Sequence, residues 1–263
     1  MHTIDTHSHF NLSQFDEDQA EAILRMREAG VGTICIGIDA PTSEKAVALA
    51  AENPDIWACV GQHPTEWGQS FIPSHMHDLA SSPRVVAIGE CGLDYFRENE
   101  RTSEAKESQR TLFVSQIELA ARFDLPLMLH IRPEAGTMTA YTEALDMLEL
   151  HKSEWPLMRG TAHFFAGTKE IADRFLNLGF HISFSGVITF VPEYEELVAH
   201  VPLERILSET DAPFAAPSPY RGRRNEPAYV VEVVKKIAQI KNLDLLEVQK
   251  HLADNAKTLF SLR

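Results

Sequence analysis

The strongest constraint on the fold is a regular alternation of short apolar runs with amphipathic, helix-like segments. Each apolar run has the length expected of a strand that is buried on both faces of a parallel sheet. Eight runs are predicted to be strands: residues 3–7, 33–38, 56–60, 85–90, 125–131, 161–163, 180–184 and 205–209. Helices are predicted over residues 16–29, 42–51, 104–123, 139–150, 168–178, 227–240 and 243–253. Because a (β/α)8 barrel typically needs roughly 250 residues, this pattern over 263 residues predicts an α/β fold of that type, a TIM barrel in one domain.

Composition is that of an ordinary globular protein and narrows the range of partners. The formal net charge is −14, and 44% of the residues are hydrophobic while 24% are charged. An acidic chain is a poor general coat for nucleic acid or for an anionic membrane, although it can still hold a local basic pocket. No apolar run approaches the roughly 18 residues of a membrane-spanning helix, and no signal peptide is recognisable. We expect no membrane association and no obligate protein partner.

The three cysteines indicate the redox environment. Cys35, Cys59 and Cys91 are odd in number and widely spaced, and each lies in an apolar, strand-like run. This distribution does not fit a disulfide framework, so a reducing cytoplasmic location is the expectation.

Metal-binding side chains begin near the N-terminus, in the segment Asp5-Thr-His-Ser-His9. Alternate side chains of a regular strand share one face, so Asp5, His7 and His9 are expected to point the same way, with Thr6 and Ser8 on the other side. Two imidazoles one strand step apart can hold a divalent ion, with a nearby carboxylate as a weak ligand or as support behind a ligand. The alternative is a polar strand at the surface, because a His-x-His pair is short and common.

Similar side chains recur at the C-terminal ends of later predicted strands: His63, Glu90, His130, His163 and Asp211. In a (β/α)8 barrel these strand ends meet on one face, where the active site lies. Imidazole and carboxylate ligands suit Zn, Mn, Fe or Ni, and with fewer histidines Mg. We therefore expect a divalent-metal site on this face. Closure of the first strand against the eighth would bring His7 and His9 beside Asp211.

Seven segments carry a resemblance to a known family, in the family's order and over nearly the whole chain. They are Asp5-Thr-His-Ser-His9, Gly61-Gln-His-Pro64, Ala87-Ile-Gly-Glu-Cys-Gly-Leu-Asp-Tyr95, Leu125-Pro-Leu-Met-Leu-His-Ile-Arg132, His163-Phe-Phe-Ala-Gly167, Glu209-Thr-Asp-Ala-Pro213 and Arg221-Gly-Arg-Arg-Asn-Glu-Pro227. With these segments the chain resembles the TatD family of metal-dependent hydrolases and deoxyribonucleases, within the amidohydrolase-like barrels. The resemblance implies a single TatD-like hydrolase barrel over residues 1–263, with about two divalent ions.

The resemblance also implies roles for individual residues. The implied ligands are His7, His9, Glu90, His130, His163 and Asp211, with Glu90 bridging the ions and His63 lining the site. A divalent ion lowers the pKa of a bound water, so that hydrolysis by this metal-activated water becomes feasible near neutral pH. We expect Glu90 and Asp211 to be catalytic, with Asp211 as a ligand and general base. Asp5 lies deeper in the barrel and is expected to support a ligand histidine from behind.

Three positions depart from the family pattern. Cys91 follows Glu90 where the family usually has an aliphatic residue. We interpret it as a small core residue, the alternative being an extra soft ligand or an oxidation point. Ala166 replaces a common serine, and Pro133-Glu134 replaces a short polar continuation after Arg132. The last two changes leave the metal ligands intact and bear on the choice of substrate.

Arginines are the clue to the substrate: Arg132 follows the fifth strand, and Arg221, Arg223 and Arg224 follow the eighth. Guanidinium groups around a metal centre suit a phosphate, and we expect these four residues and His63 to contact substrate. The alternative for the arginines is a solvated basic loop with Glu226 as a local partner. Tyr95 and Phe165 are candidates for stacking on a base, with ordinary packing as the alternative.

The sequence therefore predicts a divalent-metal-dependent hydrolase, and specifically a phosphodiesterase that acts as a 3′–5′ exodeoxyribonuclease on DNA or RNA ends. A second hypothesis keeps the metal site and changes the substrate to a small ester, amide or lactone. A third is a non-enzymatic binding module in which the metals are structural, and a fully closed coordination shell would favour it.

Overall fold

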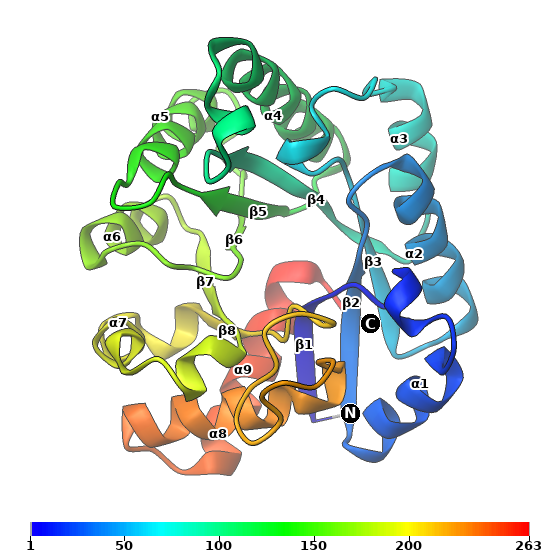
Figure 1. The fold of residues 1–263 in the computed structure, drawn as a ribbon, viewed down its shortest axis with the longest axis vertical. Coiled ribbons are helices and arrows are strands. Elements are labelled where there is room, and N and C mark those ends of the chain that lie inside the picture. Colours follow the sequence, from blue (N-terminus) through cyan, green and yellow to red (C-terminus); the bar gives the residue numbers. More distant parts are fainter. Residues whose placement is uncertain (1, 263) are drawn as a thin grey trace.

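Eight parallel strands in chain order form the centre of the computed structural model, which describes residues 2–262 (Figure 1). Each strand pairs in parallel with the next one along the chain. The strands are β1 Thr3–Ser8, β2 Val31–Ile36, β3 Ile56–Val60, β4 Val85–Asp94, β5 Leu127–Arg132, β6 Gly160–Ala162, β7 His181–Phe184 and β8 Ile206–Ser208. The predicted barrel architecture is thereby confirmed.

The barrel closes where the first strand meets the segment that follows the last. Ser8 and Ala212 form a parallel bridge, and the backbone N–H of His9 donates to the carbonyl of Ala212 at 2.7 Å. The N–H of Asp211 donates to the carbonyl of His7 at 2.9 Å. This seam lies beyond the C-terminal end of β8, so closure of the barrel and the positions of the candidate ligands His7, His9 and Asp211 depend on the same few residues.

Helices lie around the outside of the sheet (Figure 1). They are α1 Gln19–Glu28, α2 Ala40–Glu52, α3 Pro73–Ala80, α4 Ser103–Phe123, α5 Thr139–Lys152, α6 Lys169–Asn177, α7 Glu195–His200, α8 Val230–Lys241 and α9 Leu245–Phe260. Short 3-10 helices are η1 Ser13–Phe15, η2 Pro64–Glu66, η3 Glu98–Arg101, η4 Gly186–Thr189, η5 Pro192–Tyr194, η6 Leu203–Arg205 and η7 Pro227–Tyr229. Among residues 2–262, no helix combines the length and apolar character required to cross a membrane.

The C-terminal helix α9 packs on the outside of the sheet, where the first and last strands meet. Its Leu259 and Phe260 are buried in one cluster with Ile4 of β1 and Leu207 of β8. The helix therefore packs against the first and the last strand at once, and Figure 1 shows it beside this part of the sheet. Burial of these apolar side chains stabilises the pairing that aligns the two ends of the chain.

Several element boundaries differ from the sequence prediction. Helices α3 and α7 were not predicted, because each buries only two residues: Met76 and Ala80 in α3, Leu197 and Val198 in α7. Such a short apolar stripe gives little helical periodicity. Strand β4 continues past the predicted residue 90 to Asp94, and α9 continues past the predicted residue 253 to Phe260.

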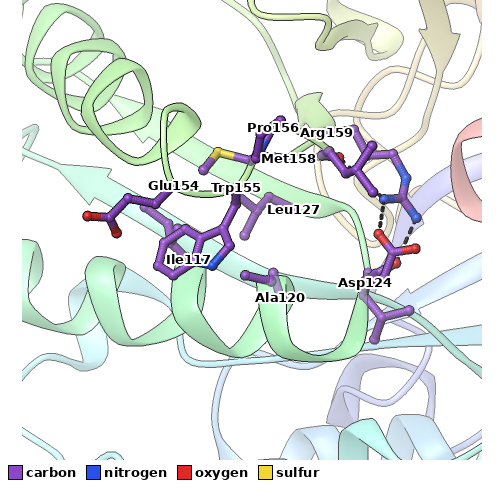
Figure 2. Close-up of a pocket in the computed structure, with 12 residues that line it drawn as sticks. Ile117, Ala120, Asp124, Leu127, Glu154, Trp155, Pro156, Met158 and Arg159 are labelled. Atoms are coloured by element: carbon purple, nitrogen blue, oxygen red, sulfur yellow. Dashed lines mark hydrogen bonds and ion pairs between the residues drawn. The ribbon is translucent and has the colours of Figure 1, made fainter.

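A pocket of about 200 Å³ opens where β5 and β6 begin (Figure 2). Its wall includes Leu127, the first residue of β5, and Arg159, which directly precedes β6. Ile117 and Trp155 line it with apolar surface, and Arg159 pairs with Asp124 at 2.6 Å. Active sites of such barrels lie at the opposite, C-terminal ends of the strands. The pocket is therefore separate from the predicted site and contains none of its residues.

Candidate metal centre

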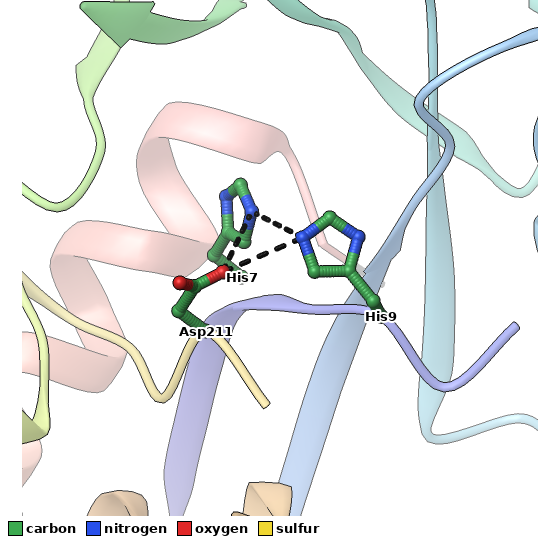
Figure 3. Close-up of side chains that lie close together, drawn as sticks. All are labelled: His7, His9 and Asp211. Carbon is green, nitrogen blue, oxygen red and sulfur yellow. Dashed lines mark hydrogen bonds and ion pairs between the residues drawn. The ribbon is translucent and has the colours of Figure 1, made fainter. Parts of the chain in front are cut away.

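His7, His9 and Asp211 converge at the barrel seam (Figure 3). The Nε2 atoms of His7 and His9 lie 3.2 Å apart. Asp211 Oδ1 lies 3.7 Å from His7 Nε2 and 3.4 Å from His9 Nε2. Both imidazoles are buried, the side chain of Asp211 points toward them, and its backbone has a positive φ of 56°. The backbone bonds of the seam thus place three ligand-type atoms from the two ends of the chain around one point.

Glu90 connects this cluster with a second one. Its Oε2 lies 3.6 Å from His7 Nε2 and 3.7 Å from His9 Nε2. Its Oε1 lies 2.8 Å from both His130 Nδ1 and His163 Nε2. His63 Nε2 lies 3.8 Å from the same Oε1. A single buried carboxylate therefore faces two groups of imidazoles with its two oxygens.

The backbone before Glu90 requires glycine. Gly89 has a φ of +148°, and a Cβ at this position would lie 2.4 Å from the carbonyl oxygen of Met128 on the neighbouring strand. This distance is far inside van der Waals contact, so a side chain would push β4 away from β5. The glycine thus permits the close strand approach from which Glu90 reaches the centre.

Three of the candidate ligand histidines have a hydrogen-bond partner on a ring nitrogen, and the sequence did not predict these partners. His130 Nε2 lies 2.9 Å from Asp94 Oδ2, and His163 Nδ1 lies 3.2 Å from Glu209 Oε1. His9 Nδ1 lies 3.2 Å from the carbonyl of Ile36. Such partners fix the tautomer and the orientation of a ligand imidazole. Their positions in the sequence could have indicated them. Asp94 ends the segment Gly92-Leu-Asp94, four residues after Glu90, and Glu209 precedes Asp211 by two residues.

Asp5 was expected to support a ligand histidine from behind, but among the described residues it bonds to backbone N–H and hydroxyl groups and not to an imidazole ring. Its carboxylate accepts from the N–H of Thr210 at 2.8 Å, from the Thr210 hydroxyl at 2.7 Å and from the N–H of His7 at 3.3 Å. The Thr210 hydroxyl in turn accepts from the N–H of Ala212 at 3.1 Å. Asp5 therefore braces the turn that carries Asp211, and burial raises its pKa well above the usual value.

The first strand does not alternate regularly, which corrects one sequence expectation. Asp5 and Ser8 were expected on opposite faces, yet the side chains of both contact the hydroxyl of Thr33, at 3.3 and 2.8 Å. The pairing of β1 with β2 shifts register between Asp5 and Ser8. This irregularity changes which side each residue faces, as a bulge does. It explains why His7 and Asp5 have different surroundings.

The spacing of the donor atoms fits a divalent ion. Ligands about 2.1 Å from a tetrahedral metal lie about 3.4 Å from one another. The Nε2 atoms of His7 and His9 are separated from each other, from Asp211 Oδ1 and from Glu90 Oε2 by 3.2 to 3.7 Å. On the other side of its ring, the buried His7 Nδ1 has no hydrogen-bond partner within the described residues. Imidazole and carboxylate donors are those that bind Zn, Mn, Fe or Ni.

The electrostatics of the cluster favour charged carboxylates. Burial opposes ionisation of Glu90, but the surrounding His163 and His7 hold its pKa well below the usual value. Against the effect of burial, Glu90 and Glu209 raise the pKa of His163 well above its usual value. Burial and the adjacent His130 lower the pKa of His63 to about 3. His63 is therefore neutral at physiological pH and can accept or donate a hydrogen bond at the edge of the centre.

The four predicted substrate-contacting arginines have different surroundings. The Arg132 guanidinium lies 3.7 Å over the ring of Phe96, and that of Arg221 lies 3.7 Å over the ring of Phe190. Arg223 is exposed. Among the described residues, none of these three pairs with a carboxylate. Arg224 does, with Asp18 at 2.8 Å and with Glu226 at 3.0 Å.

The two aromatic residues considered for stacking on a base are buried, so the packing alternative is the correct one. Tyr95 is fully buried, and its hydroxyl donates to Glu143 at 2.9 Å. Phe165 is also buried and packs edge-on against Tyr141 and Phe175. Both residues contribute to packing beneath the rim, by which we mean the loops that follow the C-terminal ends of the strands. A ring that is covered on all sides cannot stack on a base.

The three departures from the family pattern also have definite places. Cys91 is fully buried in the main apolar cluster, where burial raises the pKa of its thiol far above the usual value. The N–H of Ala166 donates to the Tyr141 hydroxyl at 2.9 Å, and Glu134 pairs with Arg101. Cys91 is thus held in the neutral, unreactive form of a core residue.

Comparison with known proteins relates this geometry to a family. The family model described as TatD related DNase matches residues 4–261. The chain is 35% identical to the uncharacterized metal-dependent hydrolase YabD of Bacillus subtilis, over 98% of both chains. It is 32% identical to the 3′-5′ ssDNA/RNA exonuclease TatD of Pectobacterium parmentieri, over 95% of this chain and 96% of that protein.

Solved structures show the same fold. YjjV, a TatD homologue from Escherichia coli, superposes with a TM-score of 0.90 at 29% identity, covering 100% of this chain and 99% of that one. A TatD family hydrolase from Entamoeba histolytica superposes with a TM-score of 0.85 at 21% identity, covering 99% and 98% of the two chains. The fold of this chain is therefore that of solved TatD structures.

Proposed function

Because the chain belongs to the family of TatD-related DNases, we propose that it is a metal-dependent phosphodiesterase that removes nucleotides from the 3′ ends of single-stranded DNA or RNA. The observation that supports this best is the position of Glu90, whose two carboxylate oxygens face two separate groups of imidazoles. A bridging carboxylate is the arrangement of two-metal sites that act on phosphoryl groups.

About two divalent ions, Zn, Mn, Ni, Fe or Mg, are proposed to bind this centre. One would be held by His7, His9, Glu90 and Asp211, and the other by Glu90, His130 and His163. Bound ions of this kind lower the pKa of water and neutralise charge on a phosphoryl group. The carboxylates of Asp94 and Glu209 hold the rings of His130 and His163 in the orientation that presents the inner nitrogen to Glu90.

The proposed proton acceptor is Asp211. Its pKa is lowered, because interactions with His9 and His7 outweigh burial, so the carboxylate is ionised at neutral pH. Asp5 and the Thr210 hydroxyl bind the backbone N–H groups of the residues on either side of it, Thr210 and Ala212, and its side chain is partly exposed, at 16%. An ionised carboxylate that is fixed and reachable by water can take a proton from an attacking water molecule.

Phosphate recognition is assigned to the guanidinium groups that have no carboxylate partner. Within residues 2–262 these include Arg132, Arg221 and Arg223 around the rim, and we place His63 inside it as a further substrate contact. Arg224 is engaged by Asp18 and Glu226, so we assign it to holding the loop after β8. Unpaired arginines favour an anionic phosphodiester over a neutral ester, amide or lactone.

The decisive experiment measures nucleotide release from a 3′-labelled single-stranded oligonucleotide by the metal-loaded protein. The wild type should release mononucleotides, and the Asp211→Ala protein should lose activity by at least about a hundredfold. Asp146→Ala is a matched control, because Asp146 is 65% exposed and pairs with Arg174. Equal release by wild type and Asp211→Ala would refute the assignment. Turnover of a small ester panel without any nucleotide release would support the alternative substrate class.

We also propose that residues 1–263 act as one hydrolase domain, since one sheet runs through the described chain. A cytoplasmic location is proposed as well. It is supported by Cys35, Cys59 and Cys91, all of which are buried and unpaired in the structure.

A further inference from the structure

Exposed aromatic rings lie in the loops that follow three of the strands. Phe96 follows β4, Phe190 follows β7 and Phe214 follows β8, with exposed fractions of 44%, 36% and 48%. By contrast, Tyr95 and Phe165 in neighbouring segments are buried. Exposing a large ring to water has a free-energy cost, so rings that share one rim of a site indicate a binding surface.

Phe96 is tied directly to the metal centre. Its N–H donates to Asp94 at 2.9 Å, and the other oxygen of Asp94 contacts His130 at 2.9 Å. The guanidinium over its ring belongs to Arg132, two residues beyond His130 on β5. Among the described residues, this guanidinium makes neither a hydrogen bond nor an ion pair. The Phe96–Arg132 pair is thus positioned by β4 and β5, the strands that carry Glu90 and His130. The N–H groups of the Arg132 guanidinium can donate to a bound anion.

A second pair of the same composition lies on the β7–β8 side of the rim. The Arg221 guanidinium lies 3.7 Å over Phe190, and one of its N–H groups donates to the carbonyl of Ala216 at 3.0 Å. The two loops are joined, because the N–H of Ser218 donates to the hydroxyl of Thr189 at 2.9 Å. The Phe190–Arg221 pair is therefore held by contacts between loops and does not depend on one flexible segment.

The chemistry of these pairs suits one kind of ligand. An aromatic ring and a guanidinium plane both stack on nucleobases, while the in-plane N–H groups of arginine bind phosphate oxygens. In a chain of net charge −14, arginines without an acidic partner are the places where an anion can approach. An apolar protein partner would match the rings but would leave the two guanidinium groups without an anionic partner.

We propose that Phe96–Arg132 and Phe190–Arg221 are two stacking platforms for single-stranded nucleic acid, each receiving one base and one phosphate beside the metal centre. This proposal rests on the proposed function and deepens it. It explains how an acidic protein holds a strand end: successive nucleotides contact a few rim residues, and the rest of the surface stays free of nucleic acid. The platforms favour unpaired strands, because bases stacked in a duplex do not offer a free face.

The test is a binding measurement that does not require turnover. Metal-loaded protein is titrated into a fluorescent decathymidine whose phosphorothioate linkages resist hydrolysis, and anisotropy gives Kd. Phe96→Leu and Phe190→Leu keep an apolar side chain and remove the ring, and each should weaken binding roughly tenfold. Leu246→Ala, which truncates an exposed residue on α9, is the control and should bind like wild type.

An abasic strand of the same length separates stacking from a loss of structure. Wild type should bind the abasic strand roughly a hundredfold more weakly than decathymidine, since both platforms lose their bases. The Phe96→Leu, Phe190→Leu double variant should scarcely distinguish the two strands. If the variants keep the affinity and the base preference of wild type, the platforms are refuted. Equal weakening on both strands would also refute stacking and would indicate general damage to the rim.

Failure of the platforms can be told apart from failure of the proposed function. If wild type releases no nucleotides but the leucine variants still lose binding, the exonuclease assignment fails and the platforms stand. If wild type releases nucleotides and the variants keep its KM on oligonucleotides, the platforms fail and the exonuclease assignment stands.

Discussion

Replacing Asp94 with asparagine tests whether the residue that contacts the proposed metal ligand His130 governs metal binding. Asp94 Oδ2 lies 2.9 Å from His130 Nε2, and the other ring nitrogen lies 2.8 Å from Glu90. If His130 offers Nδ1 to a metal, Nε2 must carry the proton, and the Asp94 carboxylate accepts it. In the Asp94→Asn variant the amide oxygen can still accept from the N–H of Phe96, which leaves the NH₂ group facing the N–H of His130.

The size of the effect follows from this mismatch and from burial. The side chains of His130 and Asp94 are only 16% and 6% exposed, so solvent screens their interaction weakly. Against the effect of burial, Asp94 and Glu90 raise the pKa of His130, so the two carboxylates together outweigh the desolvation of the ring. Losing such a partner typically weakens metal binding by about 10–100-fold. We expect the upper part of that range, or about 2–3 kcal/mol.

The assay is competition for metal against a chelating dye, followed by nucleotide release at saturating metal. Asp94→Asn should bind metal more weakly, and excess metal should restore part of the activity. Asp146→Asn, on the exposed face of α5, should match wild type. If Asp94→Asn binds metal as tightly as wild type, then His130 does not depend on Asp94 for its orientation, and the support argued from the structure is wrong.

Three further predictions concern stability. Chelation should lower Tm by several degrees, because the folded state loses about 3 kcal/mol of metal binding at a hundredfold excess over Kd, and a Glu90→Gln protein should respond less. His181→Gln should flatten the loss of stability below pH 6.5. Burial and Arg205 lower the pKa of His181 to about 4, so between about pH 4 and pH 6.5 the unfolded state binds more protons than the folded state. In urea unfolding, the free energy of unfolding lost between neutral pH and pH 5 should be about 2 kcal/mol smaller for the variant than for the wild type. Gly89→Ala should destabilise by about 3 kcal/mol or more in the same unfolding assay, because its Cβ would collide with the carbonyl of Met128.

The sequence was sufficient for the barrel and for the convergence of the ligand-type residues, and there is a physical reason. Parallel strands in chain order bring all their C-terminal ends to one face, so a residue's place along its strand predicts its place in space. His7 and Asp211 are far apart in the chain, yet closure joins them through a backbone hydrogen bond of 2.9 Å. Once the fold is known to be such a barrel, the residues at the C-terminal strand ends can be predicted to converge without further structural information.

Side-chain direction could not be predicted in the same way. Asp5 and Ser8 both reach Thr33 because the pairing of β1 shifts, and period-two alternation does not reveal such a shift. Tyr95 lies beside the exposed Phe96, but its hydroxyl finds Glu143 and its ring is covered. Which of two adjacent aromatic residues faces solvent depends on packing partners that are distant in sequence.

The arginines after β8 show the same principle at the level of function. Arg221, Arg223 and Arg224 are almost contiguous, and sequence alone assigned them equal standing. Asp18, from the segment before α1, pairs with Arg224 and removes it from the set that can bind an anion. Arg221 instead lies over Phe190, where no carboxylate of the described chain competes for it. We therefore expect the distribution of acidic partners, and not the number of basic residues, to decide which part of this acidic surface can hold a phosphate.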